Sequence, residues 1–198
     1  MFRQWCHQQG FTKSGPNSHV LMDGGTLNVP FDRLNDFYKV YVQCIKAGEQ
    51  LFVVEQKTSN YNFFLDVDYK DTEPLDLNEV RTIGLDVCAK IESFGLPPKC
   101  LISVSKPKKK DGKIKTGIHF NWPDLTVSQE GALNLMYHII HTLNISRQTC
   151  DWSQFIDKSV YGDLESGAKG SGFRMPWSHK KGKHDDCGGK GCAVCDNT

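Results

Sequence analysis

The sequence predicts an α+β fold in which antiparallel strands intermix with amphipathic helices. Apolar residues recur at helical spacing after Asp32, Asp76 and Ser128, and at strand spacing over 61–69 and 117–122. Strands and helices do not alternate regularly, as they would in a doubly wound parallel sheet. The sequence contains no internal repeat, no GxGxxG motif and no Walker-type loop, so a nucleotide site of either of those kinds is excluded.

Size and composition indicate a globular protein. The chain has 198 residues, 38% of them hydrophobic, which is enough to bury a core. No apolar run reaches the roughly 20 residues that span a bilayer, and the first residues lack the apolar segment of a signal peptide. Five of the eight cysteines are scattered without a pairing rhythm. We therefore expect an intracellular protein in a reducing compartment, without membrane contact.

The formal net charge of +1 conceals an uneven distribution of charges along the chain. Acidic residues dominate 66–92, whereas basic residues dominate 106–115 and 169–183. This asymmetry fits an enzyme that holds metal ions with carboxylates beside basic residues that bind phosphates. Each run taken alone fits a solvated loop equally well.

The first half of the chain reads as a helix followed by a hairpin. Apolar residues at helical spacing predict a helix over Asp32–Ala47, which Gly48 ends. Leu51–Glu55 and the strictly alternating Tyr61–Tyr69 read as strands with a turn between them. We expect these two strands to pair as an antiparallel hairpin.

The second half continues the mixed pattern. Asp76 and Glu79 form an N-terminal capping pair for a helix that ends near Gly95. The basic stretch Lys106–Lys115 contains Pro107 and reads as an irregular segment, either a mobile loop or a hairpin tip. The other elements expected are strands at 100–105 and 117–122 and a helix from Ser128 to Leu143.

Two aspartates on the second strand are the first candidate for chemistry. Asp66 and Asp68 occupy even positions, whereas the odd positions from 61 to 69 are apolar or aromatic. Strand geometry puts both carboxylates on one face, roughly 7 Å apart at the backbone. Paired carboxylates suit hard divalent cations. A lone D-x-D pattern is more often a solvated strand face, but like charges beside an apolar strand repel each other unless a cation lies between them.

A second candidate lies on the strand at 117–122. Lys115, Gly117 and His119 share one face of that strand. Glycine permits close approach of a phosphate, and the lysine and histidine can donate hydrogen bonds, so the three suit a triphosphate. A histidine alone is more often structural.

A third candidate begins at Asp157 and continues through the glycine-rich segment 170–175. Asp157 could supply a third carboxylate, and Arg174 and Lys180 could bind phosphates of nucleotide or template. The alternative is a surface loop followed by an edge strand.

The C-terminal cysteines form a C-x4-C-x2-C array of Cys187, Cys192 and Cys195, with His184 nearby. Three thiolates among glycines are typical of a structural zinc site, for which His184 is the preferred fourth ligand, with His179 or a residue beyond the chain as alternatives. We expect a catalytic domain over 1–178 and a zinc-binding element over 179–198.

These blocks, in this order, resemble the archaeo-eukaryotic primase superfamily, whose motifs are an acidic pair, a small-x-His strand and an apolar-Asp segment. The third block, with 157–161 and 171–176, looks most like the primase halves of primase–helicases from large DNA viruses and the related primase-polymerases. The resemblance runs from about residue 50 to the C-terminus. It implies an RRM-like catalytic core with a mixed or antiparallel sheet and flanking helices, and the host cytoplasm or nucleus as its location if the protein is viral.

The resemblance also implies roles for individual residues. Asp66, Asp68 and Asp157 would hold two Mg²⁺ or Mn²⁺ ions, and His119 would contact the nucleotide triphosphate. Lys115 and Arg174 match basic positions that bind phosphates in related enzymes. Lys180 matches such a position less securely. Gly117 stands where many members have serine, which removes a hydroxyl donor.

The function expected is therefore that of a DNA primase, which joins NTPs or dNTPs on a single-stranded DNA template, with a replicative helicase as a partner or in the same polypeptide. A metal-dependent nuclease is the first alternative, because two carboxylates and a histidine serve it equally well. The second is a zinc-stabilised module that binds single-stranded nucleic acid without catalysis.

Overall fold

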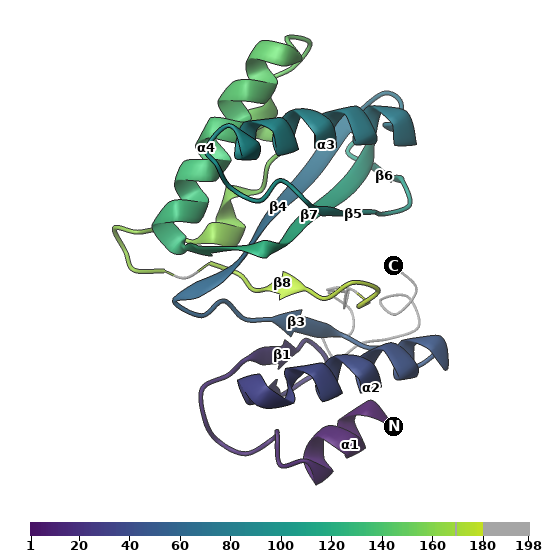
Figure 1. The fold of residues 1–198 in the computed structure, drawn as a ribbon. Helices are drawn as coiled ribbons and strands as arrows, with labels where there is room; N and C mark the ends of the chain where they lie inside the picture. The colour runs from purple at the N-terminus through teal and green to yellow at the C-terminus, as the bar shows by residue number, and fades with distance from the viewer. Residues whose placement is uncertain (169, 180–198) are drawn as a thin grey trace. The chain divides into compact units, whose positions relative to one another are not determined.

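The computed structural model describes residues 1–168 and 170–179, which divide into two compact units (Figure 1). Unit 1 comprises Met1–Thr58 and the chain from Gly172, and unit 2 comprises Ser59–Ser171. Each unit contains an antiparallel sheet of its own. The expected α+β class is confirmed, and each unit is described by itself.

Unit 1 packs two helices against a four-stranded sheet of order β2-β1-β3-β8. The predicted helix over 32–47 is confirmed, and Gly48 follows it with a φ of +79°. Its elements are α1 (Phe2–Gln8), β1 (His19–Leu21), β2 (Thr26–Leu27), the 3-10 turn η1 (Phe31–Arg33), α2 (Leu34–Lys46), β3 (Val53–Glu55) and β8 (Phe173–Arg174).

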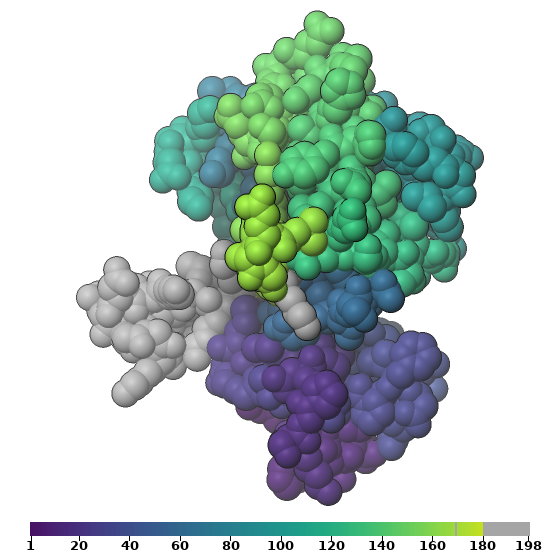
Figure 2. Space-filling model, turned by 90° about the vertical axis from the view of Figure 1, so that its left-hand side faces the viewer, coloured from purple at the N-terminus to yellow at the C-terminus, as the bar shows by residue number. Residues whose placement is uncertain are grey.

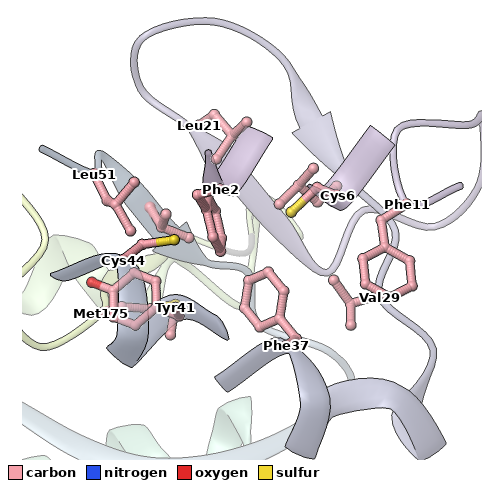
Figure 3. Close-up of a cluster of buried hydrophobic side chains, with 12 residues drawn as sticks. Phe2, Cys6, Phe11, Leu21, Val29, Phe37, Tyr41, Cys44, Leu51 and Met175 are labelled. Atoms are coloured by element: carbon pink, nitrogen blue, oxygen red, sulfur yellow. The ribbon is translucent and has the colours of Figure 1, made fainter. Parts of the chain in front are cut away.

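The core of unit 1 is aromatic (Figure 3). The Phe2 ring lies against Phe37 and Tyr41, with centroids 5.4 and 5.8 Å apart. The Tyr41 hydroxyl donates to the Pro176 carbonyl at 2.7 Å, which ties the segment after β8 to α2. The buried residues are Phe2, Cys6, Phe11, Leu21, Leu27, Val29, Phe37, Tyr41, Cys44, Leu51, Val53 and Met175.

Unit 2 is built on a sheet of order β4-β7-β5, with β6 paired to β7 as well. Its elements are β4 (Asn60–Asp71), α3 (Leu77–Glu92), β5 (Leu101–Val104), β6 (Lys108–Lys110), β7 (Lys113–Ser128), α4 (Gln129–Ser146) and the 3-10 turns η2 (Trp152–Gln154) and η3 (Lys158–Tyr161). The capping pair of Asp76 and Glu79 and the Ser128 cap are both confirmed, at the starts of α3 and α4.

The two helices of unit 2 pack on one face of its sheet. Gly84 of α3 lies so close to the sheet that a Cβ there would meet Phe120 at 3.4 Å and the end of the Ile102 side chain at 2.8 Å. Part of α4 lies at the surface of the unit (Figure 2), and Tyr137 of this helix is 54% exposed. The buried residues of β4 and β7 include Phe63, Leu65, Val67, Ile118, Phe120 and Trp122.

The expected hairpin between the strands at 51–55 and 61–69 is wrong. β3 pairs with β1 and β8, whereas β4 pairs with β7. Tight hairpins favour turn residues that adopt positive φ, such as Asn-Gly, and no glycine stands between these strands. The connecting segment instead leads from the sheet of unit 1 into the sheet of unit 2.

The basic stretch is a regular element, contrary to the loop interpretation, and the hairpin-tip alternative is confirmed. β6 and β7 pair in register from Lys110↔Lys113 to Lys108↔Lys115. Asp111 and Gly112 have φ values of 53° and 77°, and two consecutive positive φ values are typical of a type I′ hairpin turn. The lysines of this stretch therefore have fixed positions relative to the strands.

Candidate functional site

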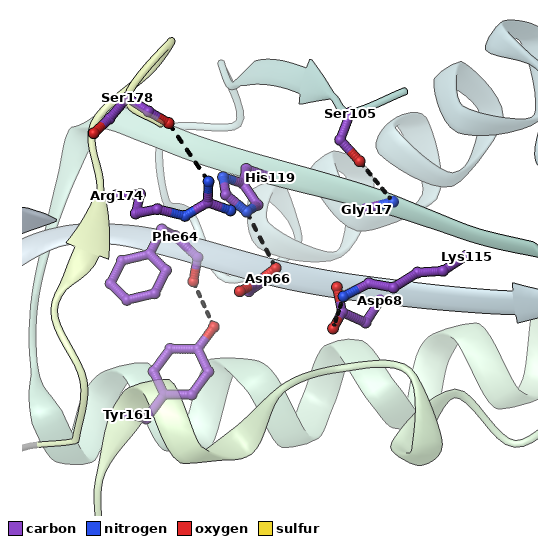
Figure 4. Close-up of polar contacts among 10 residues, drawn as sticks. All are labelled: Phe64, Asp66, Asp68, Ser105, Lys115, Gly117, His119, Tyr161, Arg174 and Ser178. Atoms are coloured by element: carbon purple, nitrogen blue, oxygen red, sulfur yellow. Dashed lines mark hydrogen bonds and ion pairs between the residues drawn. The ribbon is translucent and has the colours of Figure 1, made fainter. Parts of the chain in front are cut away.

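The face of the β4–β7 sheet that the helices leave uncovered carries the candidate residues (Figure 4). Asp66 lies directly across from His119, and Asp68 directly across from Gly117. Antiparallel partners point to the same side of a sheet, so the expected faces of both strands are confirmed. Sequence positions about fifty residues apart are thereby brought onto one surface.

Each of the two carboxylates has a basic side chain of β7 beside it. Lys115 Nζ lies 2.5 Å from Asp68 Oδ2, and His119 Nε2 lies 3.3 Å from Asp66 Oδ1. These side chains are partly buried, with exposures of 25% for Lys115, 38% for Asp68, 24% for His119 and 20% for Asp66. Lys115 therefore supplies positive charge that offsets the repulsion between the two aspartates.

Asp66 retains unused capacity as a ligand. Its Oδ1 atom is buried and accepts no hydrogen bond from the residues that the structure describes. The 3.3 Å separation from His119 Nε2 is that of an ion pair and lacks the alignment of a hydrogen bond. A buried carboxylate oxygen in this condition is costly unless something else, such as a cation, coordinates it.

Asp157 is held beside Asp66 by the backbone. The Asp157 N–H donates to the Asp66 carbonyl at 3.0 Å, and Val67 and Ile156 form an isolated antiparallel bridge on this edge of β4. The Asp157 carboxylate, however, caps η3 by accepting from the Ser159 N–H at 3.0 Å and the Ser159 hydroxyl at 2.6 Å. Both contacts go to Oδ1, so the cap is compatible with a metal ion bound through Oδ2.

Tyr161, the last residue of the motif at 157–161, is part of this site in a role that no sequence pattern indicated. Its ring stacks on Phe64 with centroids 5.4 Å apart, and its hydroxyl donates to the Phe64 carbonyl. Burial raises the pKa of Tyr161 well above its usual value, with smaller contributions from Tyr61, Asp66 and Asp157. The hydroxyl therefore stays neutral and anchors the chain after Asp157 to β4.

Ser105 is the second residue that the sequence did not single out. The Gly117 N–H donates to Ser105 Oγ at 3.2 Å, and the Ser105 N–H donates to the Gly117 carbonyl at 2.9 Å. A Cβ on Gly117 would lie 2.9 Å from Ser105 Oγ and 3.8 Å from Asp68 Oδ1. A serine hydroxyl thus occupies the space beside Asp68 that a side chain at 117 would fill, a relationship visible only once β5 and β7 are paired.

The remaining candidates lie outside this face. Arg174 belongs to unit 1, where it is paired with Val54 and its guanidinium lies 3.5 Å from the Ser178 carbonyl. His179 lies against the Phe52 ring. The other candidates fall outside the described residues, and their roles stay predictions: Lys180, His184, Cys187, Cys192 and Cys195.

No group of three or more His, Cys, Asp or Glu residues arranged to hold a metal ion occurs in residues 1–168 and 170–179. Asp66 and Asp68 remain the carboxylates that best fit a divalent cation, because they share a face and Asp66 Oδ1 lacks a hydrogen bond. Within the same ranges, no helix is long and apolar enough to cross a membrane.

Comparison with known proteins identifies the family. A family model described as the C962R protein N-terminal AEP domain, where AEP denotes archaeo-eukaryotic primase, matches residues 18–185. The match includes Asp66, Asp68, His119 and Asp157, and it ends before Cys187. No curated protein matches the chain. The antiparallel sheet, its flanking helices and this match over most of the sequence show that the chain belongs to the archaeo-eukaryotic primase domain family found at the N-terminus of C962R proteins.

Proposed function

We propose that this chain is a primase that joins nucleoside triphosphates into short primers on a single-stranded DNA template. The observation that carries the proposal is the placement of Asp66, Asp68 and His119 on one open face of the β4–β7 sheet. Membership of the archaeo-eukaryotic primase family supports a nucleotidyltransferase over the other chemistries that two carboxylates and a histidine can perform.

Asp66 and Asp68 would hold the divalent cations, Mg²⁺ or Mn²⁺, with Asp157 as the third ligand. The buried Asp66 Oδ1 atom, which accepts no hydrogen bond from the described residues, supports this assignment. Two bound cations would neutralise the triphosphate and lower the pKa of the attacking 3′-hydroxyl. Asp157 would join them through Oδ2, because both of its contacts with Ser159 use Oδ1.

Ser105, which follows β5, and residues of β7 would position the triphosphate for in-line attack by the 3′-hydroxyl. His119 and Lys115 are the donors on the aspartate face, and Lys115 would exchange its ion pair with Asp68 for a phosphate once cations neutralise that carboxylate. Ser105 accepts a hydrogen bond from Gly117 and can donate its own hydroxyl proton to a phosphate oxygen. We assign Arg174 and Lys180 to the phosphates of nucleotide or template by resemblance alone.

Catalysis in this proposal consists of positioning and electrostatic stabilisation, because phosphoryl transfer to a hydroxyl needs no protein nucleophile. The chain contributes carboxylates on β4 and donors on β7, the strand that pairs with it. A helicase partner and a zinc-stabilised C-terminal element over 179–198 complete the proposal.

The test is synthesis on unprimed template. The protein, with Mn²⁺ or Mg²⁺, labelled NTPs or dNTPs and circular single-stranded DNA, should produce short labelled oligonucleotides, and the Asp66→Asn/Asp68→Asn double variant should produce none. Degradation of the template without synthesis would instead establish the nuclease alternative. Binding of DNA with neither reaction would favour the non-catalytic module.

A further inference from the structure

Five lysines lie on the same face of the sheet as the two aspartates. In the β6–β7 hairpin, Lys108 pairs with Lys115, and Lys110 pairs with Lys113. On the other side of β7, Lys115 also pairs with Lys70 of β4. Partners across an antiparallel ladder share a face. The lysine stripe therefore consists of Lys70, Lys108, Lys110, Lys113 and Lys115.

The stripe runs directly into the candidate site. Lys115, Gly117 and His119 are alternate residues of β7, and Asp68 and Lys70 are alternate residues of β4. Successive members on one strand are roughly 7 Å apart at the backbone. The stripe is thus a straight extension of the site along the sheet, out to the hairpin turn at Asp111 and Gly112.

The positive charges of the lysine stripe outnumber the carboxylates that form ion pairs with them. Lys115 forms an ion pair with Asp68, but no carboxylate within the described residues lies at ion-pair distance from Lys70, Lys108, Lys110 or Lys113. The pKa of Asp71 is lowered chiefly by the Thr72 N–H and the Tyr69 hydroxyl, and Lys113 adds a smaller effect through charge alone.

Like charges directly opposite each other destabilise a β ladder. The pairs Lys108↔Lys115, Lys110↔Lys113 and Lys70↔Lys115 place three such contacts in one small area. An anionic ligand with regularly spaced charges would relieve this repulsion. The opposite face of the hairpin is different in character, since there Lys109 pairs with Ile114.

We propose that the lysine stripe binds the sugar–phosphate backbone of the duplex formed by the template and its nascent primer. Lysine is a point charge that reads neither base edges nor base planes, so the contacts would be to phosphates and independent of sequence. Surfaces that hold single strands combine basic residues with aromatic stacking platforms, and the stripe contains no aromatic residue. The choice of a primer–template duplex rests on the proposed function.

The test measures binding without catalysis. The full chain, in EDTA and without nucleotides, is titrated against a labelled primer–template duplex and the matching single strand over a series of salt concentrations. The Lys108→Gln/Lys110→Gln/Lys113→Gln variant removes three charges from the stripe. Lys109→Gln and Lys110→Gln form a matched pair of single variants, because these neighbours on β6 lie on opposite faces.

Each lost phosphate contact should reduce the slope of log K against log salt by about 0.9 for duplex DNA. We expect a reduction of this size for Lys110→Gln, a larger one for the triple variant and none for Lys109→Gln. Equal losses in Lys109→Gln and Lys110→Gln would overturn the proposal, because the effect would then follow net charge alone. A triple variant that loses affinity only for the single strand would also overturn it.

These outcomes are separate from the test of primer synthesis. If the chain makes no primers but binds duplex through Lys110 and not through Lys109, the proposed interface is supported and the proposed function is wrong. If the chain makes primers and the triple variant binds duplex as tightly as the wild-type chain, the proposed function is supported and the proposed interface is wrong.

Discussion

Ser105 Oγ lies 2.9 Å from the point where a Cβ on Gly117 would stand, and it accepts a hydrogen bond from the Gly117 N–H. Gly117 belongs to β7, and Ser105 follows β5, the strand that pairs with β7. In this chain, the hydroxyl on that face of the sheet comes from Ser105, immediately beyond the end of β5.

Moving the hydroxyl from position 105 to position 117 tests whether the two positions share one role. Ser105→Ala should weaken nucleotide binding roughly fivefold, the effect of about one hydrogen bond. Gly117→Ser alone should do at least as much damage, because its Cβ would crowd Ser105 Oγ. The Ser105→Ala/Gly117→Ser double variant should recover affinity, measured by calorimetric titration of a triphosphate with Mn²⁺. Additive losses in the double variant would show that the two positions do not share one role.

Removal of either aspartate should abolish nucleotide incorporation. We expect Asp66→Asn and Asp68→Asn to reduce primer synthesis by about 100-fold or more, because each removes a charged ligand from the site. Asp71→Asn is the matched control, since it removes an exposed carboxylate from the same strand. Stability should change by less than about 1 kcal/mol in Asp68→Asn, because its ion pair with Lys115 is partly exposed. Substantial synthesis by either site variant would refute the metal assignment.

His119 should act on the nucleotide and not on the metal ions. His119→Ala should weaken triphosphate affinity and slow turnover while Mn²⁺ still binds, because Asp66 and Asp68 remain in place. Manganese titration monitored by electron paramagnetic resonance would follow metal occupancy directly. A variant that no longer binds Mn²⁺ would make His119 a metal ligand and overturn the division of roles.

His19 should make the stability of unit 1 depend on pH. Its ring is 1% exposed and lies on Phe37, and burial lowers its pKa from about 6.5 to about 4. The folded chain therefore resists protonation, so stability is complete above pH 6.5 and is lost as the pH falls toward 4. The loss should reach up to about 3 kcal/mol, at about 1.4 kcal/mol for each pKa unit.

Urea denaturation at several pH values would measure this effect. His19→Gln should be less stable than the wild-type chain at pH 7, and the difference should shrink as the pH falls through this window. A difference that stays constant between pH 6.5 and 4 would contradict the prediction.

Zinc should bind the C-terminal cysteines in a one-to-one ratio. Protein purified without added metal should contain one zinc per chain, and Cys192→Ser/Cys195→Ser should contain none. Elemental analysis decides between these outcomes. In buffer that contains Mg²⁺ or Mn²⁺, the zinc-free double variant should keep most of its primer synthesis, because a structural zinc site acts locally. Zinc retained by the double variant would show that these thiols are not its ligands.

The strand faces were predictable from local sequence. Alternation along 61–69 and 117–122 correctly separated Asp66 and His119 from Val67 and Ile118. It did not predict the burial of Phe64, which lies at an even position and stacks on Tyr161. The helix caps at Asp76 and Ser128 could also be predicted from the sequence, because a cap depends only on the next few residues.

Pairing between strands that are distant in the sequence was harder to predict. The partner of β4 proved to be β7 and not β3, since cross-strand register depends on packing that no local pattern records. Ser105 and Tyr161 were missed for the same reason, as each matters through a residue on another strand. The ion pair of Lys115 with Asp68 likewise follows from register and could not be read from either residue alone.

The two edges of β4 have consequences for how the chain folds. One edge pairs with β7, and the other is covered by the segment around Ile156 and Asp157, while 97 residues separate Tyr161 from the Phe64 carbonyl that it binds. Contacts of such long sequence separation form slowly, because the loop between them must close first. During synthesis, a nascent chain that ends before Ile156 presents β4 with one edge unpaired, and an open edge of this kind recruits strands from other chains. The segment that brings Asp157 to the site thus also closes this edge of β4 once the chain is complete to that point.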